Sequence, residues 1–442
     1  AASDVYKRQY FYFSRHMIFH IYRKSVMPMN TLIETANSLL WGGFTVALIL
    51  CCGIYHTVKS GFIQLKLPKH LFSSDGKNRL GAVTSALAAS LGTGNITGCA
   101  AAIAAGGAGA VFWMWLSALG GMALAYSENR IGAEFGEKYP KSARGPMLYI
   151  EKGMGAKWPA AAYAVCCLGA AIFMGSMSQS GALSDALSAQ TPLPRYICSL
   201  AAAVVTAAVL FSSDRAAEGV MKFSARIVPV MGLLYVGGCI GLLIISKCDV
   251  SGAFADIFSQ AFSLKAAAGG AAGITVKNAV SVGLRRGIFS NEAGMGSSVL
   301  VHSEADFGEP QSAGAWAAFE VFLDTIVCCT LTALVIICCK TNDITAAFSY
   351  GFGRWGGGFV CLCICMFALA SVLGWSCYGE KCLCYITGKH CGKWCRLVFC
   401  LACAAGGFIA TESVFGISDL FNCLLMIINL PVITVLTMRS GK

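Results

Sequence analysis

The nine residues SLGTGNITG, numbers 90–98, lie within a longer stretch, residues 80–127, that contains no charged side chain. Gly92 and Gly94 have the spacing that opens a dinucleotide-binding fingerprint, but the third glycine falls one residue late, and LGAVTSALAAS upstream is not strand-like. Two interpretations then remain. The glycines either line a face on which helices pack closely, or they interrupt a helix. An interruption frees backbone N–H and C=O groups, which apolar surroundings tolerate only where these groups line a cavity or bind a ligand. We favour the interruption.

The composition is that of a membrane protein. Only 12% of the 442 residues are charged, 56% are hydrophobic, and the mean hydropathy is +0.66, whereas soluble domains carry about 25% charged residues. The apolar runs are continuous rather than alternating, which predicts an all-α polytopic membrane protein and not a β-barrel. About eleven transmembrane helices are expected, near residues 32–55, 81–105, 110–131, 158–186, 196–212, 223–246, 275–301, 313–339, 357–379, 394–411 and 415–437.

Basic residues are unevenly distributed over the predicted connections. When the connections are numbered alternately, one set carries twenty Lys and Arg, and the other, apart from the N-terminus, carries six. The positive-inside rule places the richer set and the C-terminus in the cytoplasm. It also accounts for the net charge of +11 without a nucleic-acid partner.

Two further regions need separate treatment. Residues 1–28 begin without Met and carry five basic residues on the expected outer side, so we set them aside as a doubtful N-terminal segment.

The 23 cysteines lie mostly in apolar runs, where they act as small apolar side chains. A candidate zinc cluster in a predicted cytoplasmic loop matches no paired C-x2-C pattern, so no metal beyond sodium is expected; its members are Cys382, Cys384, His390, Cys391 and Cys395.

A second interruption follows about 200 residues later, in GIFSNEAGMGSSVL, residues 287–300. The first lies in the second candidate span and this one in the seventh, and a repeat of five spans reverses orientation. Paired broken helices in inverted repeats indicate the binding site of a secondary transporter. We therefore expect a peripheral N-terminal helix at 29–58, a first repeat at 81–247 broken at 92–95, and a second repeat at 270–438 broken at 290–296.

Three long motifs carry a family resemblance. GTGNITGCAAAIAAGGAGAVFWMWLSALGGMALAYSE, AAAGGAAGITVKNAVSVGLRRGIFSNEAGMGSS and VLGWSCYGEKCLCYITG resemble the alanine or glycine:cation symporter family. The resemblance covers about residues 29–438. It implies a LeuT-type core of ten helices in two inverted repeats, and Na+- or H+-coupled uptake of alanine or glycine across a bacterial or archaeal plasma membrane. It further implies a monomer among lipids, with no organic cofactor.

The resemblance also implies residues that contact the substrate. The backbone of the first break would hold the substrate carboxylate, the second break would face the ammonium or carboxylate group, and a Trp and a Met would wall a small side-chain pocket. Asn95 has the alternative role of a helix cap, and Gln179 that of an interhelical hydrogen bond. The expected contacts are Thr93, Gly94, Asn95, Gln179, Ser290, Asn291, Met295 and Trp375.

The coupling cation has its own candidates. These are the carbonyls of Ala88 and Leu91, and the side chains of Asn95, Asp324 and Ser371. Asp324, which precedes Thr325, has the alternative role of a structural partner. Ala370 stands beside Ser371 where a second hydroxyl is expected, and because hard cations favour several oxygen ligands, proton coupling remains an alternative to sodium.

Charged residues near the second break suggest a gate. Arg285 and Arg286 are expected to lie outward of the break, where they form an outer gate, steer anions, or pair with Glu292 or Glu320 for structure. Glu292 itself is expected to face a cavity or a partner, since contact with lipid would be costly.

Two other functional classes are less well supported. A membrane-embedded enzyme lacks a base, because GWSCYG departs from the G-x-S-x-G elbow and the six histidines lie outside the span centres. An ion channel usually repeats its filter around an oligomer axis, whereas one chain with two inverted breaks favours alternating access.

Overall fold

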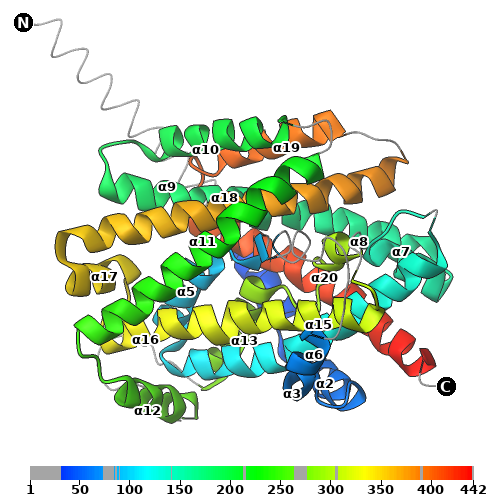
Figure 1. The fold of residues 1–442 in the computed structure, drawn as a ribbon, viewed down its shortest axis with the longest axis horizontal. Helices are drawn as coiled ribbons and strands as arrows, with labels where there is room; N and C mark the ends of the chain where they lie inside the picture. Colours follow the sequence, from blue (N-terminus) through cyan, green and yellow to red (C-terminus); the bar gives the residue numbers. More distant parts are fainter. Residues whose placement is uncertain are drawn as a thin grey trace, which may run out of the picture.

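The computed structural model describes residues 31–72, 84, 87–88, 90–140, 142–212, 216–262, 276–303, 307–388 and 392–440, which form helices and no strands (Figure 1). After a helix at Thr31–Leu40, the elements are α2 (Gly43–Lys59), α3 (Ile63–Phe72), η1 (Thr93–Asn95), α5 (Thr97–Gly106), α6 (Gly109–Lys138), α7 (Pro146–Met154), α8 (Lys157–Ala170), η2 (Ala171–Met177), α9 (Ser178–Gln190), α10 (Arg195–Leu210), α11 (Ala216–Ile245), α12 (Val250–Ala261), α13 (Val276–Asn291), α14 (Val299–His302), α15 (Pro310–Val321), η3 (Phe322–Cys329), α16 (Thr330–Cys338), α17 (Ile344–Phe352), η4 (Gly353–Trp355), α18 (Gly356–Thr387), α19 (Gly392–Ala405) and α20 (Thr411–Ser440).

Six described helices are long and apolar enough to cross a membrane, and a bent pair raises the number to seven. The expected number was about eleven, and the difference has a physical reason. The two interrupted regions are divided into short pieces such as α5 and α14, and α10 and α19 are 16 and 14 residues long. A helix rises about 1.5 Å per residue, so each of these pieces is by itself shorter than the bilayer core of about 30 Å.

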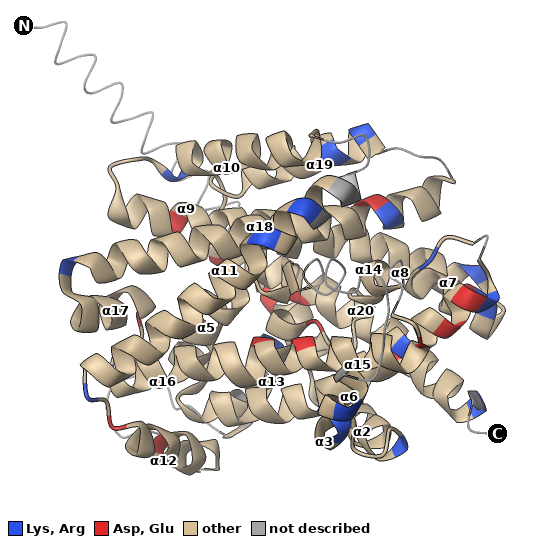
Figure 2. Ribbon diagram, viewed as in Figure 1, with Lys and Arg blue, Asp and Glu red and all other residues tan. Residues whose placement is uncertain are grey.

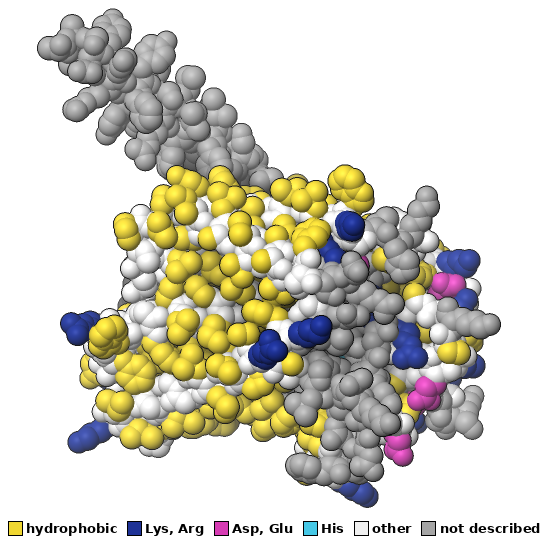
Figure 3. Space-filling model, turned by 45° about the horizontal axis from the view of Figure 1, so that its top comes forward, with side chains coloured by type: hydrophobic (Ala, Val, Ile, Leu, Met, Phe, Trp, Pro, Cys, Tyr) yellow, Lys and Arg dark blue, Asp and Glu magenta, His cyan; other side chains and the backbone are white. Residues whose placement is uncertain are grey.

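The surface and the interior differ in polarity as expected for a protein that spans a bilayer. Figure 3 shows hydrophobic side chains over much of one face, with basic residues toward its margins. Exposed apolar side chains include Leu233, Ile244 and Val204. Figure 2 shows acidic positions among the crossing helices in the middle of the bundle. The acidic residues Glu128, Glu292, Glu320 and Asp324 are all buried.

Helix packing brings the sequence-distant interruptions together. The long helix α6 packs against both α13 and α15, and α18 packs against α8 and α9. The segment η1 contacts α13, α18 and η3. The first break therefore lies at the centre of the bundle, between the second break and two other membrane helices.

Two membrane helices contain a π-helical turn. The segment η2 interrupts the helix that runs from α8 into α9, and η3 interrupts the helix from α15 into α16. A π-turn widens a helix locally, and such turns occur often at functional sites. Both segments lie beside residues that bond to the two breaks, as described next.

Candidate functional site

The first break is a short 3₁₀ turn entered through an extended glycine. Gly92 has φ −114° and ψ −168°, and the turn η1 follows before α5 begins. The backbone N–H and the hydroxyl of Thr93 both donate to Oε1 of Gln179, each at 2.9 Å. A Cβ atom built on Gly92 would lie 3.0 Å from both Gln179 Oε1 and Ser371 Oγ. Three predicted positions therefore converge on this glycine.

The second break follows the end of α13 at Asn291. Glu292, Gly294 and Gly296 have positive φ angles of 56°, 85° and 79°. A positive φ is strained for a glutamate, and hydrogen bonds hold this one. Its Oε1 accepts from Trp375 Nε1 at 2.8 Å and its Oε2 accepts from the Ser297 hydroxyl at 2.7 Å. Glu292 thus faces partners inside the bundle, as expected.

The side chain of Asp324 joins both breaks, and it lies within η3. Its Oδ1 accepts from Asn95 Nδ2 at 2.6 Å, and its Oδ2 accepts from the Ser290 hydroxyl at 2.7 Å. The Thr325 hydroxyl also donates to Oδ2, at 2.8 Å, and accepts from Asn291 Nδ2 at 3.0 Å. We call these five residues the Asp324 cluster. All five are buried, and the side-chain oxygen of Asn95 has no hydrogen-bond partner among the described residues.

The two breaks also touch directly through small residues. A Cβ atom on Gly94 would lie 3.2 Å from the Phe289 ring and 3.4 Å from the Cα of Ser290. Because glycine has no side chain, the first break can approach the backbone of the second this closely.

Trp375 and Met295 have different surroundings. Trp375 packs tightly over Gly175 in η2, where an added Cβ atom would lie 2.2 Å from the Cβ of Trp375, and the indole N–H donates to Glu292. The carbonyl of Met295 accepts from the Tyr163 hydroxyl at 2.8 Å, and the residue is fully buried. Both residues belong to the same buried apolar cluster. Whether they wall the substrate stays a proposal.

Glu128 contacts the second break from within α6, where its side chain is buried. Its Oε2 accepts from the backbone N–H of Gly296 at 3.1 Å and from Asn429 Nδ2 at 2.9 Å. Asn429 also donates to the carbonyl of Gly294 at 2.9 Å. No local sequence signal links these residues, because the contacts join α6, α20 and the second break, which are far apart in the sequence.

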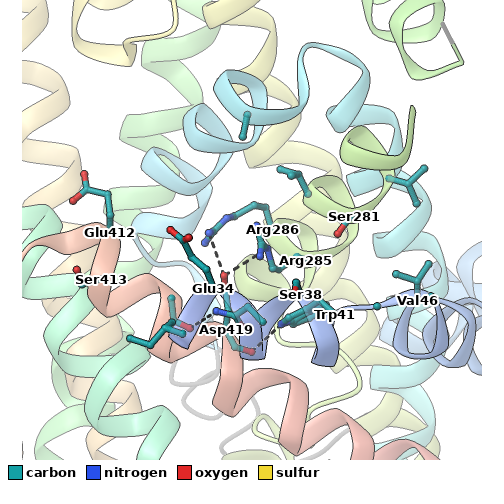
Figure 4. A pocket seen from close by; sticks show the side chains of 18 of the residues that line it. Glu34, Ser38, Trp41, Val46, Ser281, Arg285, Arg286, Glu412, Ser413 and Asp419 are labelled. Atoms are coloured by element: carbon teal, nitrogen blue, oxygen red, sulfur yellow. Dashed lines mark hydrogen bonds and ion pairs between the residues drawn. The ribbon is translucent and has the colours of Figure 1, made fainter. Parts of the chain in front are cut away.

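Arg285 and Arg286 do not pair with Glu292 or Glu320, the partners considered from the sequence. Arg285 Nε and Arg286 Nη2 lie 3.5 and 3.3 Å from Oδ2 of Asp419 in α20 (Figure 4). Glu320 instead pairs with His302 at 2.8 Å. A cavity of about 810 Å³ borders the arginines and Asp419. The expectation of a gate therefore acquires a specific partner on another helix.

The opposite end of the second break is held by a different set of bonds. Lys381 donates to the carbonyl of Leu300, and Arg144 donates to that of Ser303 at 2.5 Å. Nearby, the Tyr385 hydroxyl donates to Glu151 of α7 at 2.8 Å. This bond and one from Lys152 lower the pKa of Glu151.

The remaining candidates are placed as follows. Ala88 and Leu91 are buried in an apolar cluster that also contains Cys329, and Ser371 lies near Gly92 rather than in the Asp324 cluster. Of the expected cation ligands, Asn95 and Asp324 thus bond to each other, and Ser371 lies beside Gly92, the residue that follows Leu91. In the cysteine-rich segment, His390 and Cys391 lie outside the described residues.

Comparison with known proteins adds independent information. The sequence profile of the sodium:alanine symporter family matches residues 26–441. The sodium/alanine symporter AgcS of Methanococcus maripaludis is 34% identical, over 91% of this chain and 94% of its own length. The probable sodium/glutamine symporter GlnT of Bacillus subtilis is 33% identical, over 92% of this chain and 88% of its own.

Solved structures share the fold. The structure of MhsT in complex with L-phenylalanine aligns with a TM-score of 0.58 at 14% identity, over 82% of this chain and 89% of that one. A Na+-coupled sialic acid symporter aligns with a TM-score of 0.50 at 15% identity, over 86% and 82%. At these identities the likeness concerns the fold, which is the LeuT-type arrangement.

Proposed function

Because the chain belongs to the sodium:alanine symporter family, as its three motifs predict, we propose that it couples the entry of sodium to the uptake of alanine or glycine by alternating access. Family and fold together identify a sodium-coupled amino-acid transporter and not an enzyme. The choice of substrate and the roles of individual residues are the proposal.

The observation that carries the proposal is the Asp324 cluster. One buried carboxylate accepts hydrogen bonds from Asn95 of the first break and Ser290 of the second. A buried charge is costly unless it is paired and hydrogen-bonded, and here one partner lies in the irregular backbone of the first break and the other in the last turn of α13, directly before the second break. Such segments bind small ions and zwitterions in transporters with inverted repeats. We propose that the two proposed repeats, residues 81–247 and 270–438, meet at this point.

The proposed substrate is small because the space at the breaks is small. Gly92 and Gly94 face Gln179, Ser371 and the second break at contact distance. A void of about 10 Å³ borders the second break near Asn291 and Glu292, which is about the room that one water needs. A modest rearrangement there makes room for the hydrogen or methyl side chain of glycine or alanine. A larger side chain requires a much larger rearrangement.

The proposed cation ligand set includes Asp324 and the side-chain oxygen of Asn95. That oxygen is buried and unpartnered among the described residues, and sodium, as a hard cation, takes oxygen ligands. The carbonyls of Ala88 and Leu91 and the hydroxyl of Ser371 remain proposed contributors. Proton binding to Asp324 is the alternative use of the same carboxylate.

A substrate panel tests the proposal. The purified chain in proteoliposomes, with an inward sodium gradient, is given labelled alanine and unlabelled competitors. We expect glycine and alanine to compete strongly, and glutamine and phenylalanine weakly. Equal competition by glutamine would overturn the proposed substrate, while leaving the class of transporter intact.

A further inference from the structure

The axis of the first described helix, Thr31–Leu40, is bent by 43° relative to that of α2. The bend falls at Trp41 and Gly42, just before α2 begins. It turns the first helix toward the outward end of α20, where Figure 4 shows Trp41 beside Asp419. The sequence assigns this helix to a peripheral segment, outside the two repeats.

Two side chains of this region bond to the backbone of α20. Asn37 Nδ2 donates to the carbonyl of Gly416 at 2.8 Å, and Trp41 Nε1 donates to the carbonyl of Asp419 at 3.0 Å. Trp41 and Asn37 are 4% and 6% exposed. A buried donor of this kind fixes the position of the carbonyl that accepts from it, because a buried donor without an acceptor costs free energy.

Close packing accompanies these bonds. Gly416 has no side chain, and a Cβ atom there would lie 2.8 Å from Cγ2 of Ile33. The first helix therefore rests directly on the backbone of α20, one helical turn before Asp419.

The carboxylate of that same Asp419 is the partner of Arg285 and Arg286. Beneath this ion pair, the Arg286 guanidinium lies 5.5 Å from the Phe289 ring centre and 5.4 Å from that of Phe415. The two rings meet edge to face at 5.3 Å, and Phe289 touches Gly94 of the first break. The ion pair and the rings thus close the outward side of the proposed substrate site.

We propose that Trp41 and Asn37 are positioning residues for the outer gate: by holding the outward turn of α20, they keep Asp419 aligned with Arg285 and Arg286 in the closed state. This inference rests on the proposed function. A helix outside the repeats then sets how stably the substrate is enclosed. Apparent affinity falls in proportion to the population of the competent state, so loss of these bonds raises KM more than it lowers kcat.

The variant that tests this is Trp41→Phe, which removes the indole N–H and keeps an aromatic ring. We expect KM to rise about fivefold, the value of one hydrogen bond of about 1 kcal/mol, with kcat changed less than about twofold. The matched control is Trp113→Phe, which removes an indole bond to the carbonyl of Ala261 in α12 at 3.3 Å, rather than one to α20, and is expected to leave KM unchanged.

A double-mutant cycle separates positioning from general structure. In an Asp419→Asn background, where the ion pair is already lost, we expect Trp41→Phe to have little further effect on KM. An equal rise in both backgrounds would overturn the proposal, as would an unchanged KM for Trp41→Phe alone. If Trp41→Phe inserts poorly, Gly416→Ala displaces the same helix, and Gly237→Ala, with nothing within 4 Å, is its control.

A measurement without substrate distinguishes failure of this inference from failure of the proposed function. Amide hydrogen exchange over residues 411–422 is expected to quicken in Trp41→Phe and not in Trp113→Phe. Unchanged exchange contradicts the positioning role. A wild-type chain that transports neither alanine nor glycine contradicts the proposed substrates instead, while this exchange result still decides the inference.

Discussion

At Asp324, one carboxylate accepts hydrogen bonds from residues of both breaks and from its neighbour Thr325. The sequence predicted the importance of Asn95, Ser290 and Asp324 from a family motif, but it left open whether Asp324 was only a structural partner. The structure shows that Asn95 and Ser290 both donate hydrogen bonds to Asp324. Hydrogen bonds to a charged group contribute about 1.5–3 kcal/mol each, so the charge state of Asp324 strongly affects how the breaks are held.

Replacement of Asp324 by Asn removes the charge and keeps the shape. We expect uptake to fall at least about tenfold, because each lost charge-assisted bond costs about 1.5–3 kcal/mol. Initial uptake rates in proteoliposomes measure this. Asp343→Asn is the matched control, since Asp343 is an exposed helix cap that accepts from Thr345 N–H at 2.9 Å, a role that Asn also fills. Uptake by Asp324→Asn close to that of the control would exclude a direct role for the carboxylate.

The second prediction at this scale concerns Gly94. An added methyl group would press on the Phe289 ring at 3.2 Å and on Ser290 at 3.4 Å, so Gly94→Ala is expected to separate the breaks and raise KM. Gly237→Ala, which meets no atom within 4 Å, is expected to behave as wild type. The comparison of KM values decides the matter, and equal values for both variants contradict the close contact.

At the scale of helices, the interruptions were accessible from sequence because glycine and polar residues are conspicuous within apolar runs. The first appears as a 3₁₀ turn at Thr93–Asn95, and the second as a run of positive φ angles after Asn291. The π-turns η2 and η3 were not predicted, because widening of a helix depends on what packs against it. The partner Asp419 was also missed, since it is distant in sequence from Arg285.

Glu128 of α6 provides a test of how the second break is supported. In Glu128→Ala, the Gly296 N–H and the Asn429 amide lose a buried acceptor, which costs about 1–3 kcal/mol. We expect a clearly lower thermal unfolding temperature in detergent. Glu134→Ala, which removes a half-exposed partner of Arg130 in the same helix, is expected to change it little, since exposed ion pairs contribute about 0–1 kcal/mol. A Glu128→Ala chain as stable as Glu134→Ala would refute this support.

At the scale of the whole molecule, the two ends of the second break are closed differently. An ion pair beside a cavity of about 810 Å³ lies at one end. Lysine and arginine bonds to backbone carbonyls lie at the other. This asymmetry suits a molecule that opens to one side at a time, and the unequal distribution of basic residues predicts which side is cytoplasmic.

The topology can be tested by attaching green fluorescent protein to the C-terminus. The positive-inside rule predicts a cytoplasmic C-terminus, where the reporter fluoresces. A C-terminal alkaline phosphatase fusion is the complementary control and is expected to be inactive. An active phosphatase with a dark fluorescent reporter would reverse the orientation and exchange the two gates.

The central claim is that sodium drives amino-acid uptake through the site between the two breaks. The most direct measurement is accumulation of labelled alanine in proteoliposomes, with external sodium replaced by choline at fixed pH. We predict accumulation above equilibrium with sodium, and uptake close to that of empty liposomes with choline. Accumulation that continues unchanged in choline, and follows an imposed pH gradient instead, would contradict sodium coupling.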